Sequence, residues 1–333
     1  MKCHPSGPAD RVGAPICVLL LLSLVSCGGE VAHDPYSTDD TCELTIDETY
    51  PGANSIDAYV RDPIEFHLSE VDPEAWVVAD MPGVQTSREE GRVVVFTPDE
   101  PLSPLTSYTF GLEYCRDTPE IQFTTSDLGL PIEDIEALEG ETFLLDLSTA
   151  RFREGAILAE ALTRLVRGEV AVQIIEVGDQ DMWVRAGIVQ VRGDEIEQDT
   201  CFRTLEIPEF RLERSDGFFS YEADLYALPF YEGELNLSDF GLEGTVAADS
   251  TELGGGRAAL VLDARDFSAA LNLPNENELC DLTEGMGSPC VPCEDGGQAC
   301  LELEVEGLRA LLVDGSLALI GERNAHEDCE KRE

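Results

Sequence analysis

The stretch that decides the fold is Ile64-Glu65-Phe66-His67-Leu68. Apolar and polar residues alternate along it, and a period of two is typical of a half-buried β-strand. The phase places His67 on the outward face, where we expect a surface residue. Similar short strands are expected at residues 93–96, 108–112 and 121–123. Turns containing proline or glycine separate them, at residues 51–52, 72–73, 82–83 and Pro98. This spacing predicts an all-β sandwich.

The same region resembles a bacterial Ig-like domain of the surface-layer-protein type. Residues 50–53 and 64–73 resemble the opening of that domain, residues 95–98, 101–102 and 106–109 its middle, and residues 123–125 its closing strand. The match covers residues 43–126 and departs at Cys115-Arg116-Asp117, where the family usually carries an Asp/Gly/Asn loop. The resemblance implies an Ig-like sandwich over residues 42–126 that acts as a spacer or adhesion module and carries no catalytic residues.

A second, larger β-rich domain is predicted over residues 141–322, after a linker at 127–140 that contains Leu128-Gly129-Leu130-Pro131. Between Gly155 and Gly168, apolar residues at helical spacing predict one amphipathic helix; they are Ile157, Leu158, Ala161, Leu162 and Leu165. Strands are predicted at 142–147, 170–176, 182–191, 210–213, 218–227, 230–237, 242–248, 258–263, 301–305 and 310–313. Together they predict a large curved sheet or a partly closed barrel. We expect Trp183 in its core, with ligand stacking as the alternative.

Residues 1–26 have the pattern of a secretory signal peptide. Lys2 and Arg11 precede an apolar run over residues 14–23, which is shorter than the about 20 residues that span a bilayer. Leu24-Val25-Ser26-Cys27 then resembles the lipobox of bacterial lipoprotein precursors. That resemblance implies cleavage before Cys27 and covalent attachment of lipid, including acyl chains such as palmitate, at this cysteine. The alternative is an ordinary secreted protein with a chance cysteine at the cleavage site.

The expected location of the mature protein is the outer membrane, on its periplasmic face or at the cell surface. Gly28 stands where an aspartate would typically retain a lipoprotein at the inner membrane. Residues 27–41 are polar and acidic and are expected to form a lipidated tether, and residues 323–333 are expected to form an acidic tail.

The formal net charge is −47, and Lys331 is the one lysine that remains after residues 1–26 are removed. Nucleic acid and anionic lipid headgroups need a basic face, so neither is an expected partner. Envelope or surface proteins and glycans remain as candidate partners, beside the membrane that the lipid anchor reaches. The acidity is explained by a solvated surface or by divalent-cation binding. No Asp-x-Asp-x-Asp-Gly loop is present, so no metal site is assigned.

Eleven cysteines are present, of which Cys3, Cys17 and Cys27 lie in the signal peptide or at the anchor. The other eight are Cys42, Cys115, Cys201, Cys280, Cys290, Cys293, Cys300 and Cys329. An even number in an exported chain predicts four disulfides. Cys42 and Cys115 flank the sandwich and are expected to pair, and Cys201 is expected to pair with Cys329. The insertion at 280–300 suggests either two disulfides of unspecified connectivity or a zinc knuckle, and the oxidising compartment favours disulfides without metal.

No catalytic motif is present: neither Gly-x-Ser-x-Gly, His-Glu-x-x-His, a P-loop nor Gly-x-Gly-x-x-Gly occurs. His4 lies in the signal peptide, His33 in the tether and His326 near the C-terminus. We therefore expect no catalytic residue, no cofactor beyond the lipid on Cys27, and a structural or adhesion-like binding role in the cell envelope. The alternative is that the C-terminal β domain carries an apolar ligand, such as a lipid, beneath its curved sheet.

Overall fold

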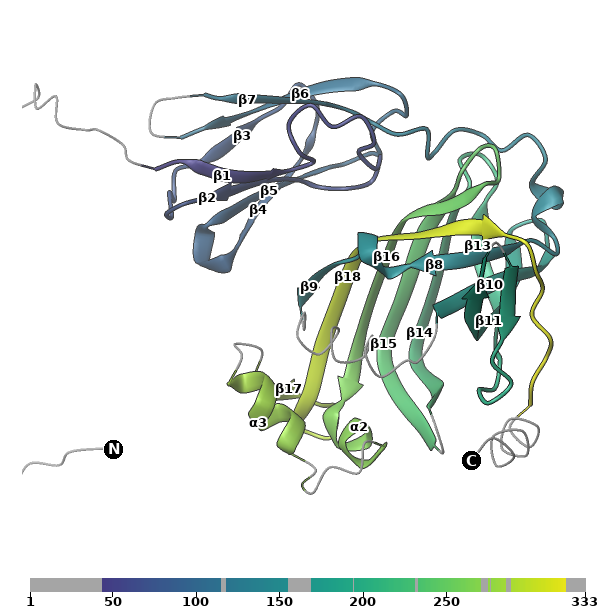
Figure 1. Cartoon of the computed structure of the whole chain (residues 1–333). Helices are drawn as coiled ribbons and strands as arrows, with labels where there is room; N and C mark the ends of the chain where they lie inside the picture. The colour runs from purple at the N-terminus through teal and green to yellow at the C-terminus, as the bar shows by residue number, and fades with distance from the viewer. Residues whose placement is uncertain are drawn as a thin grey trace, which may run out of the picture. The chain divides into compact units, whose positions relative to one another are not determined.

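The computed structural model is mostly β, as the sequence predicts (Figure 1). It describes residues 44–114, 118–154, 169–193, 195–230, 233–270, 275, 277–285 and 289–321. The signal peptide, Cys27, the tether, the predicted helix at 157–165 and the acidic tail lie outside these residues. Among the helices of the described part, none has the length and apolar character needed to cross a membrane.

Residues 46–124 form two antiparallel sheets. One sheet has the strand order β1 (Ile46–Tyr50), β2 (Ile64–Leu68), β5 (Val93–Pro98) and β4 (Gly83–Arg88), with the 3-10 turn η1 (Glu89–Gly91) joining β4 to β5. The other has the order β3 (Trp76–Val78), β6 (Ser107–Glu113) and β7 (Glu120–Thr124). The predicted strands at β2, β5, β6 and β7 are confirmed. Most residues of β4 are exposed, so the strand lacks the apolar alternation that reveals the others.

Aromatic packing and one amide hold the two sheets of the sandwich together. Phe66, Phe110 and Phe123 are almost fully buried, and the rings of Phe110 and Phe123 stack with centroids 5.8 Å apart. At one side Gln85 of β4 accepts a hydrogen bond from the Val77 N–H at 2.8 Å and donates one to the Ala75 carbonyl at 2.9 Å. This side chain therefore links the edges of β4 and β3 and occupies edge groups that would otherwise be unpaired.

The larger domain contains a closed eight-stranded barrel. Its strands, in spatial order, are β10 (Glu169–Val177), β8 (Thr142–Asp146), β18 (Gln298–Val313), β16 (Glu252–Asp263), β15 (Gly233–Val246), β14 (Phe218–Phe230), β13 (Leu205–Glu213) and β11 (Asp181–Arg192). Pairing between β10 and β11 closes the ring. The sheet also includes β9 (Arg151–Glu154) and β17 (Val291–Pro292), both on β18, and β12 (Glu195–Gln198) on β11. Two 3-10 turns, η2 (Ile135–Leu138) and η3 (Leu147–Thr149), flank β8.

Some barrel strands are longer than the sequence pattern suggests. The separate strands predicted at 301–305 and 310–313 form the single strand β18. Gly307 interrupts the alternation between them, because the register passes from the Arg257–Glu306 pair to the Gly256–Leu308 pair and skips this glycine, whose φ is +69°. A bulge of this kind shifts the phase of the apolar residues without ending the strand. The sequence pattern alone therefore looks like two strands.

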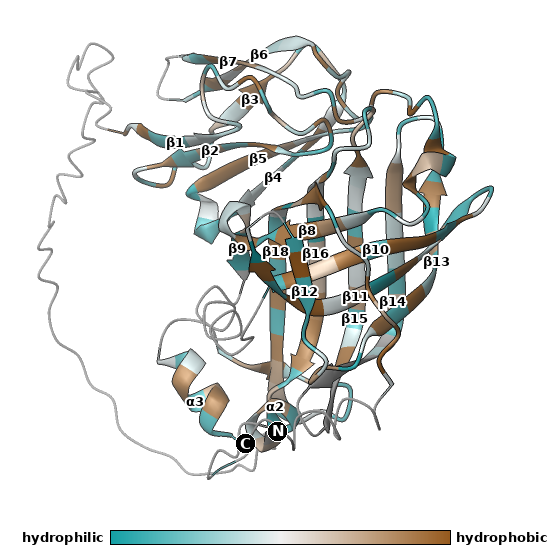
Figure 2. Ribbon diagram, turned by 45° about the vertical axis from the view of Figure 1, so that its right-hand side comes forward, coloured by the Kyte–Doolittle hydropathy of each residue, from teal (hydrophilic) through white to brown (hydrophobic). Residues whose placement is uncertain are grey.

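Apolar side chains of the described residues pack inside the barrel. One buried cluster draws on all eight barrel strands and on η2; it includes Ile135, Leu138, Phe143, Ile174, Met182, Val184, Ile207, Phe210, Leu212, Phe219, Val246 and Ala310, with Leu242 and Leu253 packed against it. Hydrophobic and hydrophilic residues alternate along the strands (Figure 2). Dense filling is the normal state of a protein interior. The lipid-carrier alternative depends on the predicted helix at 157–165, which lies outside the described residues, and stays a hypothesis.

Trp183 does not lie in this core, and its predicted placement is wrong. Its side chain is 39 % exposed, whereas Met182 and Val184 on either side are buried. Neighbouring residues of a strand point to opposite faces. The two smaller apolar residues take the interior positions and leave the indole on the outer face.

Two short helices, which the sequence analysis does not predict, pack at one end of the long strands (Figure 1). They are α2 (Ala264–Ala270) and α3 (Glu278–Glu284). Phe267 and Leu279 from these helices form a second apolar cluster with strand residues such as Leu262 and Leu301. This end of the domain thus has a small core of its own, beside the disulfide-bonded insertion.

Candidate functional site

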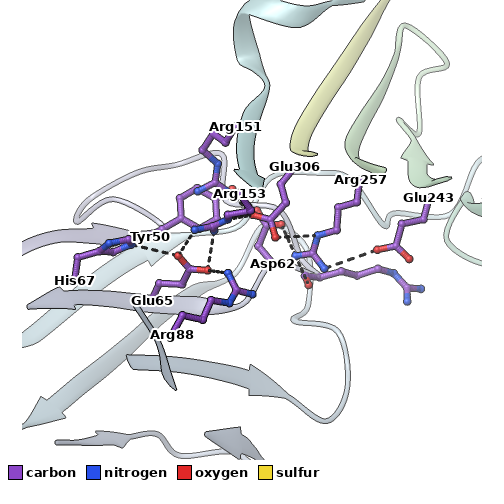
Figure 3. A network of polar contacts seen from close by, with 11 residues as sticks. Tyr50, Asp62, Glu65, His67, Arg88, Arg151, Arg153, Glu243, Arg257 and Glu306 are labelled. Carbon is purple, nitrogen blue, oxygen red and sulfur yellow. Dashed lines mark hydrogen bonds and ion pairs between the residues drawn. The ribbon is translucent and has the colours of Figure 1, made fainter. Parts of the chain in front are cut away.

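The most unusual feature of the described chain is a set of buried charges where the sandwich meets the barrel domain (Figure 3). The side chain of Glu65 is 0 % exposed and that of Glu306 is 2 % exposed. Arg153 of β9 lies between them: Nη1 and Nη2 donate to the two Glu65 oxygens at 2.7 Å each, and Nε donates to Glu306 Oε2 at 2.7 Å. One guanidinium therefore bridges a carboxylate of β2 and a carboxylate of β18.

Further side chains contact these two carboxylates. Arg88 Nη1 lies 3.2 Å from Glu65 Oε1, and His67 Nε2 lies 3.3 Å from Glu65 Oε2. Arg151 Nη2 donates to Glu306 Oε2 at 3.2 Å, and its guanidinium stacks on the Tyr50 ring. Buried carboxylates are tolerated only when paired and hydrogen-bonded in this way. The cluster is therefore a buried network of ion pairs that joins the sandwich to the barrel domain.

Asp62 forms a second branch of the network. Its side chain is 4 % exposed, accepts a hydrogen bond from Arg257 Nη2 at 3.1 Å, and accepts another from the Tyr50 hydroxyl. Burial raises the pKa of Asp62 above its ordinary value, while Arg257 and the Tyr50 hydrogen bond act in the opposite direction. Burial likewise raises the pKa of Tyr50, so this phenol stays a hydrogen-bond donor.

The raised pKa of Asp62 predicts a pH-dependent effect of Asp62→Asn. A carboxyl whose folded pKa is raised contributes stability in its neutral form, and that contribution is lost as the pH rises through the folded pKa. Asparagine stays neutral, so between about pH 4 and pH 7 the unfolding free energy of Asp62→Asn should fall less than that of the wild type. Urea unfolding at both pH values measures the difference.

Asp146→Asn is the control of opposite sign. Hydrogen bonds from Ser148 lower the pKa of Asp146, so its contribution is present above its ordinary pKa and is lost as the pH falls. Asp146→Asn should therefore destabilise the protein more at neutral pH than in acid. If Asp62→Asn followed the same trend as Asp146→Asn, burial would not dominate at Asp62.

Tyr59 forms the apolar part of the same interface. Its ring lies directly on Gly255 of β16, where a Cβ atom would overlap it, and Leu128 packs in the same way on Gly254. The Tyr59 hydroxyl is 2.7 Å from Thr245 Oγ1, and burial raises the pKa of Tyr59 to about 12. Ala247 of the barrel domain belongs to the sandwich core. Residues 44–333 accordingly form one compact unit.

This interface was not predicted from the sequence. The strand at Ile64–Leu68 was predicted to be half-buried, but Glu65 on its outer face is buried as well. The prediction is corrected at this residue, because Arg153 covers the outer face there. His67, expected on the surface, is half-buried against Glu65. The segment Tyr59–Glu65 contributes Tyr59, Asp62 and Glu65 to the contact, and Tyr59 lies on Gly255, the middle residue of the run Gly254-Gly255-Gly256. This glycine run was the available signal.

The chemistry open to this cluster is limited. A cavity of about 140 Å³ opens beside it, lined by His67, Arg88, Glu89, Val93, Arg153 and Glu304. Arg88, Arg153 and His67 all face the Glu65 carboxylate, so these side chains are already engaged in contacts within the protein. The described lining also places no serine, threonine or cysteine beside His67, and a hydroxyl or thiol next to a base is the usual mark of nucleophilic catalysis.

The cysteine insertion at 280–300 contains two disulfides, as predicted. Cys280 pairs with Cys290 and Cys293 with Cys300. Asp263, Cys293 and Cys300 place possible ligand atoms within 4.8 Å of one another. The two sulfurs are bonded to each other, however, and the Asp263 carboxylate is held by Arg265 at 2.6 Å. Zinc needs thiolates, so this group does not fit a metal in the oxidised protein.

Peptide mapping without reduction should recover both bridges, and elemental analysis should find no stoichiometric zinc. Replacing Cys280 and Cys290 together by serine should lower the unfolding free energy by about 2–3 kcal/mol, as expected for a short closed loop. One zinc per chain, with reduced thiols at these positions, would overturn the assignment.

The remaining predicted cysteines are placed only in part. Cys201 is disulfide-bonded. Cys27, Cys42, Cys115 and Cys329 lie outside the described residues, so the lipid anchor and the pairs Cys42–Cys115 and Cys201–Cys329 stay predictions.

Comparison with known proteins identifies no family for this chain. No family model matches it, and no curated protein matches it. Among solved structures it is similar to an L,D-transpeptidase from Mycobacterium smegmatis, with 15 % identity and a TM-score of 0.23. The match covers 43 % of this chain and 76 % of that protein. A likeness this low supports no conclusion about activity.

Proposed function

We propose that the mature protein is a lipoprotein of the outer membrane, anchored through Cys27, with a non-catalytic structural or adhesion-like binding role. The observation that carries this proposal is the buried network between the sandwich and the barrel domain. Glu65, Arg153 and Glu306 join three strands from both parts. Charged groups that could otherwise serve a reaction are used to fix one β-rich part against the other.

A fixed junction suits a protein that presents a surface at a distance from a membrane. The polar segment over residues 27–41 would act as the tether, and residues 44–333 would be held above the bilayer as one body. Two or more acyl chains give durable anchoring, since each buried CH2 contributes about 0.8 kcal/mol. The strongly acidic chain would stay hydrated and would not adhere to anionic headgroups. Its partners would be envelope or surface proteins or glycans.

The anchor is tested by changing Cys27 to serine. Mass spectrometry of the wild-type N-terminus should find Cys27 as the first residue, carrying acyl groups. The wild type should fractionate with the outer membrane. The membrane-bound fraction of Cys27→Ser should be at least about tenfold smaller than that of the wild type, because the acyl chains supply the attachment. Cys3→Ser, in the signal peptide, is the matched control and should leave the distribution unchanged. An unmodified Cys27 would refute the anchor, and robust hydrolysis of envelope polymers would refute the non-catalytic role.

A further inference from the structure

The sandwich carries a cavity of its own, on the outer face of the sheet β3-β6-β7. Its volume is about 210 Å³. Its lining comes from β7, from the start of β6 and from the loop between β1 and β2, and includes Asn54, Ser55, Ile56, Ser107, Gln122 and Thr124. Phe123 of the sandwich core also lines it. In β7, Gln122 is exposed whereas Phe123 is buried, so the Gln122 side chain points away from the core.

The free edge of β7 is already closed by the loop between β1 and β2. The Asn54 N–H donates to the Gln122 carbonyl at 2.6 Å, and the Thr124 N–H donates to the Ser55 carbonyl at 2.8 Å. Peptides that bind to a sheet commonly add to it as an extra strand, through main-chain groups of this kind. Because these groups are occupied, the cavity offers a ligand side-chain amides and hydroxyls and does not offer a strand edge.

The lining of this cavity is neutral. It consists of two amides, three hydroxyls, the apolar side chain of Ile56 and the core residue Phe123, without a charged residue among them. Such a lining is unusual in a chain in which 27 % of the residues are charged and the net charge is −47. A charged ligand would lose hydration there without gaining an ion pair, and an anion would also be repelled by the acidic chain. The lining therefore favours a neutral ligand that is rich in hydroxyl groups.

Two of the hydroxyl positions have bonding capacity to spare. Ser107 Oγ and Thr124 Oγ1 are 2.8 Å apart, and whichever of them donates in this pair, the other keeps its own O–H for a ligand. The Ser55 Oγ atom is buried and has no hydrogen-bond partner among the described residues. Buried hydroxyls are normally paired, and a ligand oxygen in the cavity that Ser55 lines would supply a partner.

Trp76 stands on the same outer face of the sheet. It pairs with Glu113 of β6, whereas Gln122 of β7 pairs with Thr109 of β6. The four residue steps between Glu113 and Thr109 place Trp76 about 13 Å from the cavity along the strand direction. The indole is 59 % exposed, so it presents a flat apolar surface to the solvent. A chain of several linked units could contact both places, whereas a single small ligand could not.

We propose that the outer face of the sheet β3-β6-β7 binds a neutral glycan chain, with one sugar residue in the cavity and another on Trp76. The amides and hydroxyls of the lining match the donors and acceptors of sugar hydroxyl groups. Ile56, which is 79 % exposed, and the indole match the apolar C–H faces of sugar rings. This inference deepens the proposed binding role and rests on it, because it names the class of ligand and the surface that takes it.

The fluorescence of Trp76 tests the site in the mature, full-length protein. The chain has two tryptophans, Trp76 and Trp183, so Trp183→Phe leaves Trp76 as the reporter. This protein, in a detergent without a sugar headgroup, is titrated with cellotetraose, mannotetraose and chitotetraose, which are neutral tetrasaccharides. At least one of them should shift the emission saturably to shorter wavelength, because a stacked sugar displaces water from the indole. A response to chitotetraose alone assigns the site to N-acetylated glycans, and a response to the other two assigns it to plain hexose polysaccharides.

Gln122→Ala and Ile56→Ser remove contacts within the cavity and should each weaken this binding by about 2- to 10-fold, the loss expected for one neutral contact. Both residues are exposed, so neither change should alter the thermal melt. Because the reporter is Trp76, their effect would show that the cavity and the indole hold the same glycan chain. Val84→Ser is the matched control: Val84 is 57 % exposed, but it lies in β4 of the other sheet, and the affinity should stay unchanged.

The glycan site would be overturned if none of the three tetrasaccharides changed the emission, or if Gln122→Ala and Ile56→Ser left the affinity unchanged. Tighter binding of tetragalacturonate, an anionic tetrasaccharide, would overturn it as well. Sedimentation of the same protein with isolated cell envelopes separates this inference from the proposed function. Binding to envelopes without binding to the tetrasaccharides would overturn the glycan site alone, and the absence of both would overturn the binding role with it.

Discussion

Replacing Arg153 by methionine should lower the unfolding free energy by about 3–5 kcal/mol, the loss typical of removing one partner from a buried ion pair. Methionine keeps much of the side-chain volume but leaves Glu65 and Glu306 without their shared donor. Arg88 still faces Glu65, and Arg151 still faces Glu306, so the loss should fall within this range and not beyond it. Urea unfolding followed by fluorescence measures the change.

Arg192→Met provides the matched control. Arg192 pairs with Glu197 at 2.8 Å, but their side chains are 69 % and 57 % exposed, so its loss should stay below about 1 kcal/mol. Adding Glu65→Gln and Glu306→Gln to Arg153→Met should recover part of the stability, because the buried charges are then gone. A cost of Arg153→Met no greater than that of Arg192→Met would show that the network contributes little to stability.

The same network bears on how the protein unfolds. The sequence predicts residues 42–126 as a separate Ig-like domain, and this stays a prediction. In the full chain, Glu65 and Asp62 are buried, and they interact with Arg153 and Arg257 of the barrel domain. An isolated sandwich would instead expose both carboxylates to water. We therefore expect the intact protein to unfold with both parts coupled, and the isolated sandwich to lack the stabilisation that Arg153 provides.

The sandwich strands were predictable from sequence because their signal is local. Phe66, Phe110 and Phe123 stand in alternating stretches, and the alternation alone identifies the buried face. The barrel was predictable only as a class, since closure depends on β10 pairing with both β8 and β11, and register between distant strands leaves no local trace. The division of β18 failed for a local reason, namely the bulge at Gly307.

The interface was not predicted, because the residues that form it have the pattern of exposed residues when the sequence is read locally. Glu65 in an alternating strand has the pattern of a solvent-facing residue. Its closest partner, Arg153, which donates two hydrogen bonds to the carboxylate, lies 88 positions away in the sequence. The disulfides behaved in the opposite way. Their presence followed from cysteine number and compartment, while the pairs Cys280–Cys290 and Cys293–Cys300 required the coordinates.

Gly255→Ala should destabilise the protein by about 2–5 kcal/mol, from two additive causes. Gly255 has a φ of +59°, and an L-residue in the left-handed region costs about 1–2 kcal/mol. The new methyl would also overlap the Tyr59 ring, and overpacking of this kind typically costs about 1–3 kcal/mol. The ring cannot move aside easily, because its hydroxyl is fixed on Thr245.

Gly193→Ala separates the two causes. Gly193 also has a positive φ, +71°, but a Cβ atom there would meet nothing within 4 Å, so this variant should show the backbone cost of about 1–2 kcal/mol alone. In a Tyr59→Ala background the ring is absent, and Gly255→Ala should then cost no more than Gly193→Ala. The double-mutant cycle therefore reports the contact between Tyr59 and Gly255 directly. A cost of Gly255→Ala that stays the same with and without the Tyr59 ring would mean that β16 does not hold the sandwich through this contact.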